Sequence, residues 1–286
     1  MSEYKTLLVH AEEAGADARL RLAGALADRF GAMLIGLGAG EAMPPMVADP
    51  MAADGAIIAE ALDIERETIG AELAAAEQRF RALAGDRPEQ RIGWRAVFDY
   101  PAATLAREAR AADLLIIGRD SERLRRGVFR SADPGDVLMQ AGRPVLVVPP
   151  DIAELVARHV VMAWKDTREA RRAAIDAMPF LRQAERVLVL EVCEAGADED
   201  EVGRARACVA DVAAWLERHG VTNVTSEAVA RREDTVTDQI LLATEQQHAD
   251  LIVAGGYGHA RTREWVFGGV TRGLLHHCPK CCLLSH

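Results

Sequence analysis

The chain repeats itself, and this repeat constrains the fold more than any other feature of the sequence. Residues 112–118 read Ala-Asp-Leu-Leu-Ile-Ile-Gly, and residues 249–255, at an offset of 137, read Ala-Asp-Leu-Ile-Val-Ala-Gly. Each is a short apolar run with β-branched residues that ends at a glycine, which is typical of a buried parallel strand running into a loop. The same offset carries residues 145–148 onto residues 282–285. The 286 residues therefore predict two copies of one folding unit.

Each half alternates strands with helices. We expect strands at residues 6–9, 33–37, 91–98, 114–117 and 145–148, and again at 160–163, 187–192, 223–230, 251–254 and 281–284. We expect helices at residues 14–30 and 57–83, from Pro101, from a cap at Asp133, and at 168–181, 202–219, 234–247 and 269–277. This alternation builds parallel sheets with helices on both faces. We predict an α/β fold of two tandem five-stranded parallel-sheet domains, residues 1–150 and 151–286, with the boundary at Pro149-Pro150-Asp151.

Composition and charge narrow the classes of function. Hydrophobic residues make up 50% of the chain and charged residues 27%, which is typical of a globular protein. The net charge of −10 repels DNA, RNA and anionic lipid at long range. No apolar run approaches the ~20 residues that span a bilayer, and the first residues do not resemble a secretory signal. We expect a cytoplasmic protein with neither nucleic-acid nor membrane partners.

Glycines cluster between the fourth strand and the last helix of the second half. The sequence reads Gly255-Gly256-Tyr257-Gly258, then nine residues, then Gly268-Gly269-Val270-Thr271. Glycine after a buried strand lets the backbone lie close to a ligand, and the first N–H groups of a helix suit phosphate oxygens. Thr271 adds a hydroxyl donor. In open parallel sheets the ligand lies at the carboxyl ends of the strands. The pattern favours a phosphate-binding loop, with a flexible glycine-rich connection as the alternative.

This glycine pattern resembles a known signature. Gly255-x-x-Gly258, nine residues and then Gly268 with a small residue after it is similar to the ATP-binding motif of the universal stress protein family, and residues 255–275 resemble its tandem, two-repeat members. The resemblance covers essentially the whole chain. It implies a Rossmann-like fold with an adenine nucleotide between the first and fourth strands of the second repeat. The residues that it assigns to the nucleotide are Lys165, Asp166, Ala254, Gly255, Gly258, His259, Gly268, Gly269, Val270 and Thr271.

Both halves depart from the family pattern. Members that bind ATP usually carry an aspartate at the tip of the first strand, where this chain has Lys165, and Asp166 one residue later would take a ribose hydroxyl. At the offset of 137, the first half keeps Gly118 but has Ser131 and Ala132 in place of Gly268 and Gly269. Because these side chains would crowd a phosphate, we predict that the first half is a degenerate structural partner.

The cysteine-rich tail offers a competing site. Residues 276–282 read His-His-Cys-Pro-Lys-Cys-Cys, which has metal ligands at close spacing and a Cys-x-x-Cys. Neighbouring strand residues point to opposite faces, so Cys281 and Cys282 do not readily share a metal. Cys278 follows a helix, whereas a redox cysteine lies at a helix N-terminus. We predict no metal site and no catalytic residues.

The sequence therefore predicts a tandem universal stress protein that binds ATP or another adenine nucleotide, with or without Mg, in its second repeat. It would act in stress response or signalling, with at most slow ATP hydrolysis. The resemblance suggests that the repeats pack as two single-domain subunits would, with further assembly into a homodimer and protein partners that the sequence does not identify. The alternatives are an interaction scaffold of the same fold that binds no nucleotide, favoured by Lys165, and a weak ATPase.

Overall fold

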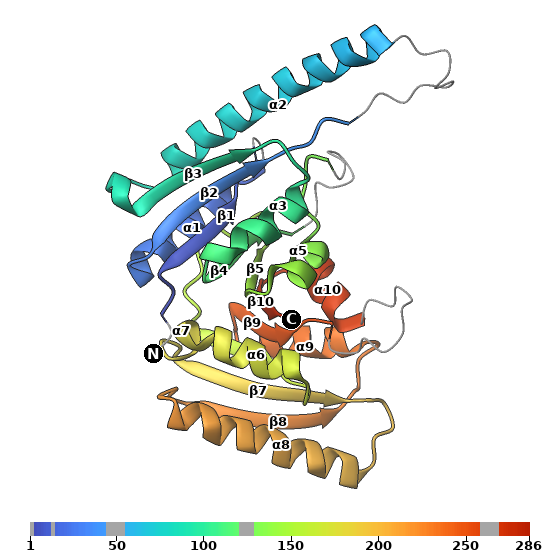
Figure 1. Ribbon diagram of the computed structural model, residues 1–286. Helices are drawn as coiled ribbons and strands as arrows, with labels where there is room; N and C mark the ends of the chain where they lie inside the picture. Colours follow the sequence, from blue (N-terminus) through green and yellow to red (C-terminus); the bar gives the residue numbers. More distant parts are fainter. Residues whose placement is uncertain (1–2, 13–14, 44–54, 120–128, 258–268) are drawn as a thin grey trace.

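The strands form one twisted sheet with helices on both faces (Figure 1). The computed structural model describes residues 3–12, 15–43, 55–119, 129–257 and 269–286, and within them the sheet has ten strands in the order β3-β2-β1-β4-β5-β10-β9-β6-β7-β8. Each half thus repeats one order, with its first strand between its second and fourth. Pairing is parallel within each half. The predicted α/β fold, with five parallel strands in each half, is confirmed, but the two sets of strands form one continuous ten-stranded sheet rather than two separate sheets.

The element bounds follow the predicted alternation closely. The strands are β1 Thr6–His10, β2 Met33–Ala39, β3 Ile92–Val97, β4 Leu114–Gly118, β5 Val145–Val148, β6 His159–Ala163, β7 Arg186–Cys193, β8 Val224–Ala230, β9 Leu251–Gly255 and β10 Cys281–Ser285. The helices are α1 Asp17–Phe30, α2 Gly55–Leu83, α3 Pro101–Glu108, α5 Pro134–Ala141, α6 Arg168–Asp176, α7 Met178–Leu181, α8 Glu199–Arg218, α9 Val236–Gln246 and α10 Gly269–His277. Short 3-10 turns, η1 Glu89–Arg91 and η2 Ala109–Ala111, complete the described elements.

Helix caps set several of the observed helix bounds, and two of them differ from the prediction. Asp133 caps α5 as predicted, because its side chain accepts the Asp136 N–H. The helix expected to begin at residue 202 begins at Glu199, where Asp198 and Glu201 form a capping box. Thr235, rather than Asp234, caps α9. The helix expected over 168–181 divides into α6 and α7.

The two halves join through their last strands. β5 and β10 pair antiparallel, with Leu146 opposite Leu283, so strand direction reverses at the centre of the sheet. This pairing satisfies the backbone groups of two edges that would otherwise be exposed. The predicted boundary at residue 150 falls in the connection between β5 and β6, and the division into two domains stays a prediction.

Two apolar layers cover the sheet, and each runs across both halves. One layer packs α1, α2, α6, α7 and α8 on one face, and the other packs α3, α5, α9 and α10 on the opposite face. Cys281 lies in the first layer and Cys282 in the second, as the alternation of strand side chains predicts. Tyr4, Phe30 and Phe180 join the halves in the first layer, with ring centroids 5.1–5.6 Å apart in edge-to-face contacts.

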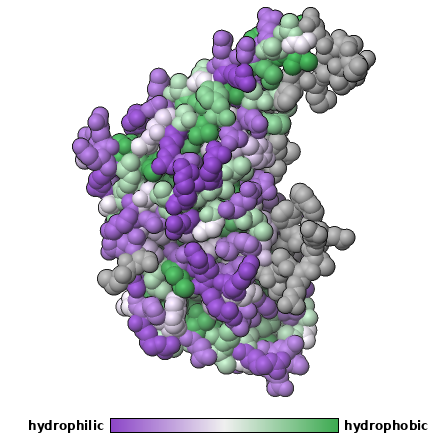
Figure 2. All heavy atoms as spheres, in the orientation of Figure 1, coloured by the Kyte–Doolittle hydropathy of each residue, from purple (hydrophilic) through white to green (hydrophobic). Residues whose placement is uncertain are grey.

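Helix α2 extends past the sheet. Its second part buries Ile69 and Leu73, whereas Ile57 and Ile64 in its first part are 66% and 59% exposed. Figure 2 shows the resulting apolar surface near the projecting end of the helix. Within the described residues, no helix is both long and apolar enough to cross a membrane.

Candidate functional site

The strand order locates a candidate binding crevice in the second half. β6 lies between β7 and β9, so the connections from β6 and β9 leave toward different sides of the sheet. Ligands of open α/β sheets bind in the crevice outside the carboxyl ends of the strands at such a switch point. The crevice here lies between the end of β6 at Ala163 and the end of β9 at Gly255. Both residues are half-buried, so solvent reaches this edge.

Gly255 allows helix α6 to lie directly against the end of β9. A Cβ atom at Gly255 would lie 2.5 Å from the backbone nitrogen of Ala170, which is closer than real Cβ contacts. Thr167 caps the same helix, because its hydroxyl accepts the Ala170 N–H at 3.3 Å. Glycine at 255 therefore has a packing reason of its own, besides the close approach to a ligand that the sequence predicts.

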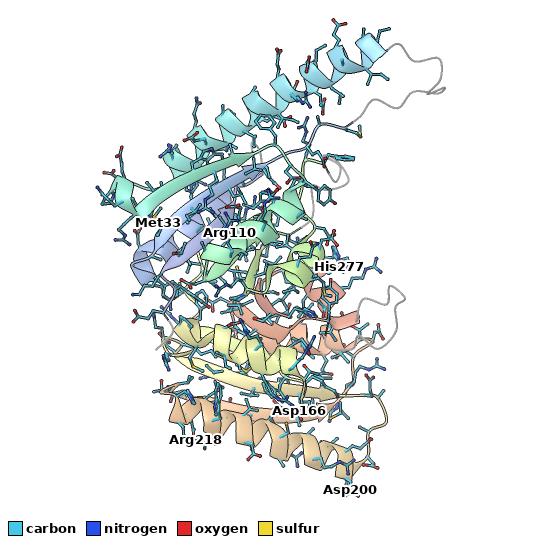
Figure 3. The ribbon with its side chains drawn as sticks, in the orientation of Figure 1. Met33, Arg110, Asp166, Asp200, Arg218 and His277 are labelled. Carbon is cyan, nitrogen blue, oxygen red and sulfur yellow. The ribbon has the colours of Figure 1, made fainter. Side chains whose placement is uncertain are left out.

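Lys165 and Asp166 both lie at the tip of β6 and remain largely exposed. The Lys165 Nζ lies 3.6 Å from Glu191 Oε1 on β7, with the lysine side chain 57% exposed and the glutamate side chain 9%. Asp166 follows β6 and precedes α6 (Figure 3), and its Oδ1 pairs with Arg171 at 2.6 Å. A cation and a carboxylate are thus available at the edge of the crevice.

Glu191 is a charged residue at this edge that sequence reasoning missed. Burial raises the pKa of the Glu191 carboxyl above its usual value, although the Lys165 ammonium acts in the opposite direction. A signal was present in the sequence, because Glu191 interrupts the apolar run 187–192 of an otherwise buried strand. A buried carboxylate in such a run calls for a partner, and Lys165 supplies it.

The start of α10 forms the other wall. Gly269 is its first residue, and a Cβ there would meet nothing within 4 Å among the described residues. Val270 is half-buried against the second apolar layer. Thr271 is buried, and its Oγ1 accepts the Tyr257 N–H at 3.1 Å. The hydroxyl therefore holds the segment that follows β9 against α10.

The remaining predicted residues are placed as follows. Ala254 is buried in the second apolar layer, so only its backbone can face the crevice. Gly258, His259 and Gly268 lie outside the described residues. The structure thus brings Lys165, Gly255 and the first turn of α10 to one edge of the sheet, and the phosphate role of the loop itself stays a prediction.

Comparison with known families identifies this half of the chain. A family model described as the universal stress protein family matches residues 153–286. Residues 153–286 are a universal stress protein domain. No curated protein matches the chain.

Solved structures extend the likeness to the whole fold. A universal stress protein from Archaeoglobus fulgidus DSM 4304 is 15% identical, covers 98% of this chain and 95% of its own, and superposes with a TM-score of 0.63. A functionally unknown protein from Pseudomonas aeruginosa PAO1 is 14% identical, covers 99% of this chain and 92% of its own, and gives 0.57. At these identities the likeness shows the fold. The two-part architecture of this chain therefore also occurs in a universal stress protein.

The first half has larger side chains at the positions that Ala163 and Ala170 hold in the universal stress protein domain. Leu7 pairs with Leu114 as Val160 pairs with Leu251, so His10 and Glu12 correspond to Ala163 and Lys165. Arg19, the third residue of α1, takes the place of Ala170, the third residue of α6.

Three side chains occupy the equivalent crevice of the first half. The Arg19 Nε donates to the His10 carbonyl at 2.9 Å, and its Nη2 lies 3.5 Å from Glu12 Oε2. Glu12 Oε1 lies 3.3 Å from the His10 Nδ1. A Cβ at Gly118 would overlap the Arg19 guanidinium. The retained glycine therefore borders a filled crevice, which gives the first half a physical reason to lack a ligand.

The cysteine tail forms no cluster with other ligand types. Within the described part of the chain, no three His, Cys, Asp or Glu side chains are grouped to hold a metal ion. Cys278, Cys281 and Cys282 are buried, and burial raises the pKa of Cys281 to about 12. Thiols that remain protonated react poorly, so the structure treats Cys281 as a small apolar side chain.

Proposed function

We propose that the universal stress protein domain binds an adenine nucleotide at the carboxyl ends of β6 and β9. The observation that carries the proposal is that small residues, Ala163, Ala170 and Gly255, meet at the ends of β6 and β9, where the Arg19 side chain packs in the first half. The family supplies the ligand class and the role in stress response or signalling. We propose further that residues 1–150 and 151–286 are two tandem repeats; the cytoplasmic location and the homodimer stay predictions.

The phosphates would face the start of α10. The free N–H groups of a helix's first turn carry partial positive charge, and Gly269 adds no side chain that would crowd an anion. Lys165 adds a full positive charge at the other wall, 57% exposed and free to turn toward a ligand while Glu191 stays behind it. Together these groups bind anions locally in a chain whose net charge is −10.

Isothermal titration calorimetry with ATP tests the proposal, with AMP and GTP as comparison ligands and Mg²⁺ present or absent. Gly269→Glu places a carboxylate where the phosphates are expected, and should weaken ATP binding by about 100-fold, or ~2.7 kcal/mol. Gly203→Glu is the matched control, because Gly203 is an exposed helical glycine on α8 whose Cβ would also meet nothing within 4 Å. Wild-type protein that binds no nucleotide, or equal binding by both variants, would reject the proposal.

The interaction scaffold remains the second candidate, because Glu191 already pairs with the charge of Lys165 at the tip of β6 without a ligand. Native mass spectrometry of freshly purified protein distinguishes the two, since a bound nucleotide adds its mass. A scaffold would carry no added mass and would show no heat with ATP. Turnover of labelled ATP separates a binding protein from a weak ATPase.

A further inference from the structure

The segment that follows β9 packs against the first half of the molecule. Gly256 donates its N–H to the Ser285 carbonyl at 2.8 Å, and the His286 Nδ1 lies 3.1 Å from the Gly256 carbonyl. A Cβ at Gly256 would lie 2.5 Å from Leu138 Cδ2 on α5. The backbone that leaves the crevice therefore runs directly over a helix of the other half.

Tyr257 also contacts the first half across this junction. It adopts a left-handed backbone conformation with φ of +58°, and its N–H donates to Thr271 Oγ1 in α10. Its phenol extends to the start of α5, where a Cβ on Gly135 would lie 2.5 Å from Tyr257 Oη and 3.6 Å from Cζ. One residue thus joins the end of β9, the start of α10 and the start of α5.

The surroundings of the phenol disfavour its ionised form. Burial, with Asp133 and Asp136 nearby, raises the pKa of Tyr257 to about 12. The first half reaches back in the same way, because the Arg119 Nη1 donates to the Cys278 carbonyl at 2.7 Å just after α10. Arg119 follows β4 as Gly256 follows β9, so the two contacts are related by the repeat.

We propose that Tyr257 is a positioning residue for the nucleotide site, which it holds in its binding geometry by anchoring Gly255 and α10 on α5 of the first half. The inference rests on the proposed function. It assigns a role to the first half: α5 influences the affinity of the site for the nucleotide, although no residue of α5 binds the nucleotide. Binding groups that are fixed in advance lose less entropy when the ligand arrives.

The test is a rescue experiment on the full chain. Gly135→Ala adds a methyl group that would lie 2.5 Å from the Tyr257 hydroxyl and 2.9 Å from Asp133 Oδ1. It should weaken ATP binding about 10-fold, because it disturbs the preorganised site. Tyr257→Phe removes only the hydroxyl and should change the affinity less than about 3-fold, since it leaves the ring in place. In the double variant the contact with the hydroxyl is gone and Cζ lies at an ordinary distance of 3.6 Å, whereas the contact with Asp133 Oδ1 at 2.9 Å remains, so affinity should return only part of the way to that of Tyr257→Phe.

Two comparisons separate positioning from simple destabilisation. Gly203→Ala on α8 is the matched control, because it adds a methyl group in open space. Tyr257→Ala removes the ring without adding an atom, and should reproduce the 10-fold loss even if Gly135→Ala fails to fold. Melting temperatures are measured beside every affinity.

The affinities of these variants for ATP decide whether the inference holds. Loss of affinity in Gly135→Ala that Tyr257→Phe restores in part, with melting temperatures near wild type, supports the inference. Wild-type affinity in both Gly135→Ala and Tyr257→Ala refutes the inference and leaves the proposed function standing. A wild-type protein that binds no nucleotide refutes both.

Discussion

The two halves of the sheet share one strand order and differ at the crevice that this order creates. In the first half, His10, Glu12 and Arg19 form a largely buried polar cluster at the ends of β1 and β4. In the second, Ala163 and Ala170 are small and Lys165 faces outward. The same strand order therefore carries different side chains at the two switch points, and under the proposed function these side chains decide which half binds a ligand.

Introducing the first half's charged pair into the second half should cause the largest loss of ATP binding. Lys165→Glu combined with Ala170→Arg recreates the Glu12–Arg19 pair in the second half. We expect ATP binding to fall at least 100-fold, or ~2.7 kcal/mol, because a guanidinium then occupies the crevice. Calorimetry measures the loss.

The matched control for the transplant is Ala207→Arg, which adds the same side chain on the exposed side of α8. It should bind ATP like wild type. Retained binding in the transplant, with a melting temperature close to wild type, would show that the nucleotide lies elsewhere.

A second comparison concerns the glycine that both halves retain. Gly255→Ala drives a methyl group into the backbone of α6, which cannot move without shifting the helix, so we expect a loss of about 3 kcal/mol in the free energy of unfolding. Gly118→Ala meets only the far end of the Arg19 side chain, and should cost about 1 kcal/mol. Urea denaturation measures both values. Equal losses in the free energy of unfolding would mean that the same kind of contact requires glycine at both positions.

The smallest expected effect concerns Glu191, whose counterpart in the first half is Gly38. Burial raises the pKa of Glu191 in the folded state, so the folded protein holds this proton more tightly than the unfolded chain. Stability contributed by the protonated form is lost as pH rises from the unfolded value of 4.5 through the raised folded pKa. Glu191→Gln should remove that loss. The stability of the variant relative to wild type should therefore increase as pH rises through this window.

The check on Glu191 is a series of urea denaturations from pH 4 to pH 8 on wild type and variant. The two curves should converge at the acidic end, where the wild-type carboxyl is protonated. A variant that becomes less stable than wild type as the pH rises would show that the Lys165 pair outweighs the cost of burial.

The comparison of the two halves also shows how far sequence reasoning reached. The apolar runs of β4 and β9 and the cap at Asp133 were predictable, because strand burial and capping are local properties. The filled crevice was not, because it depends on Arg19 meeting Gly118 across the fold. The sequence showed an arginine near the start of one helix and an alanine in the other, but nothing local says which side chain turns inward.

The candidate site was predicted in the same uneven way. Its location follows from strand order, and the structure brings Lys165, Gly255 and Gly269 to one edge of the sheet. Two features depended on tertiary contacts: the Lys165–Glu191 pair and the reach of Tyr257 to α5. Neither partner lies near the other in sequence, so periodicity and spacing carry no signal for either contact.

The antiparallel pairing of β5 with β10 has a consequence for assembly. If the two halves were separate subunits, their junction would form and dissociate with protein concentration. Here residues 149–158 tether the strands, so the effective concentration at the junction is set by the length of that tether. Dilution cannot separate the halves, and every molecule carries one half with Arg19 against Gly118 and one half with Ala170 against Gly255.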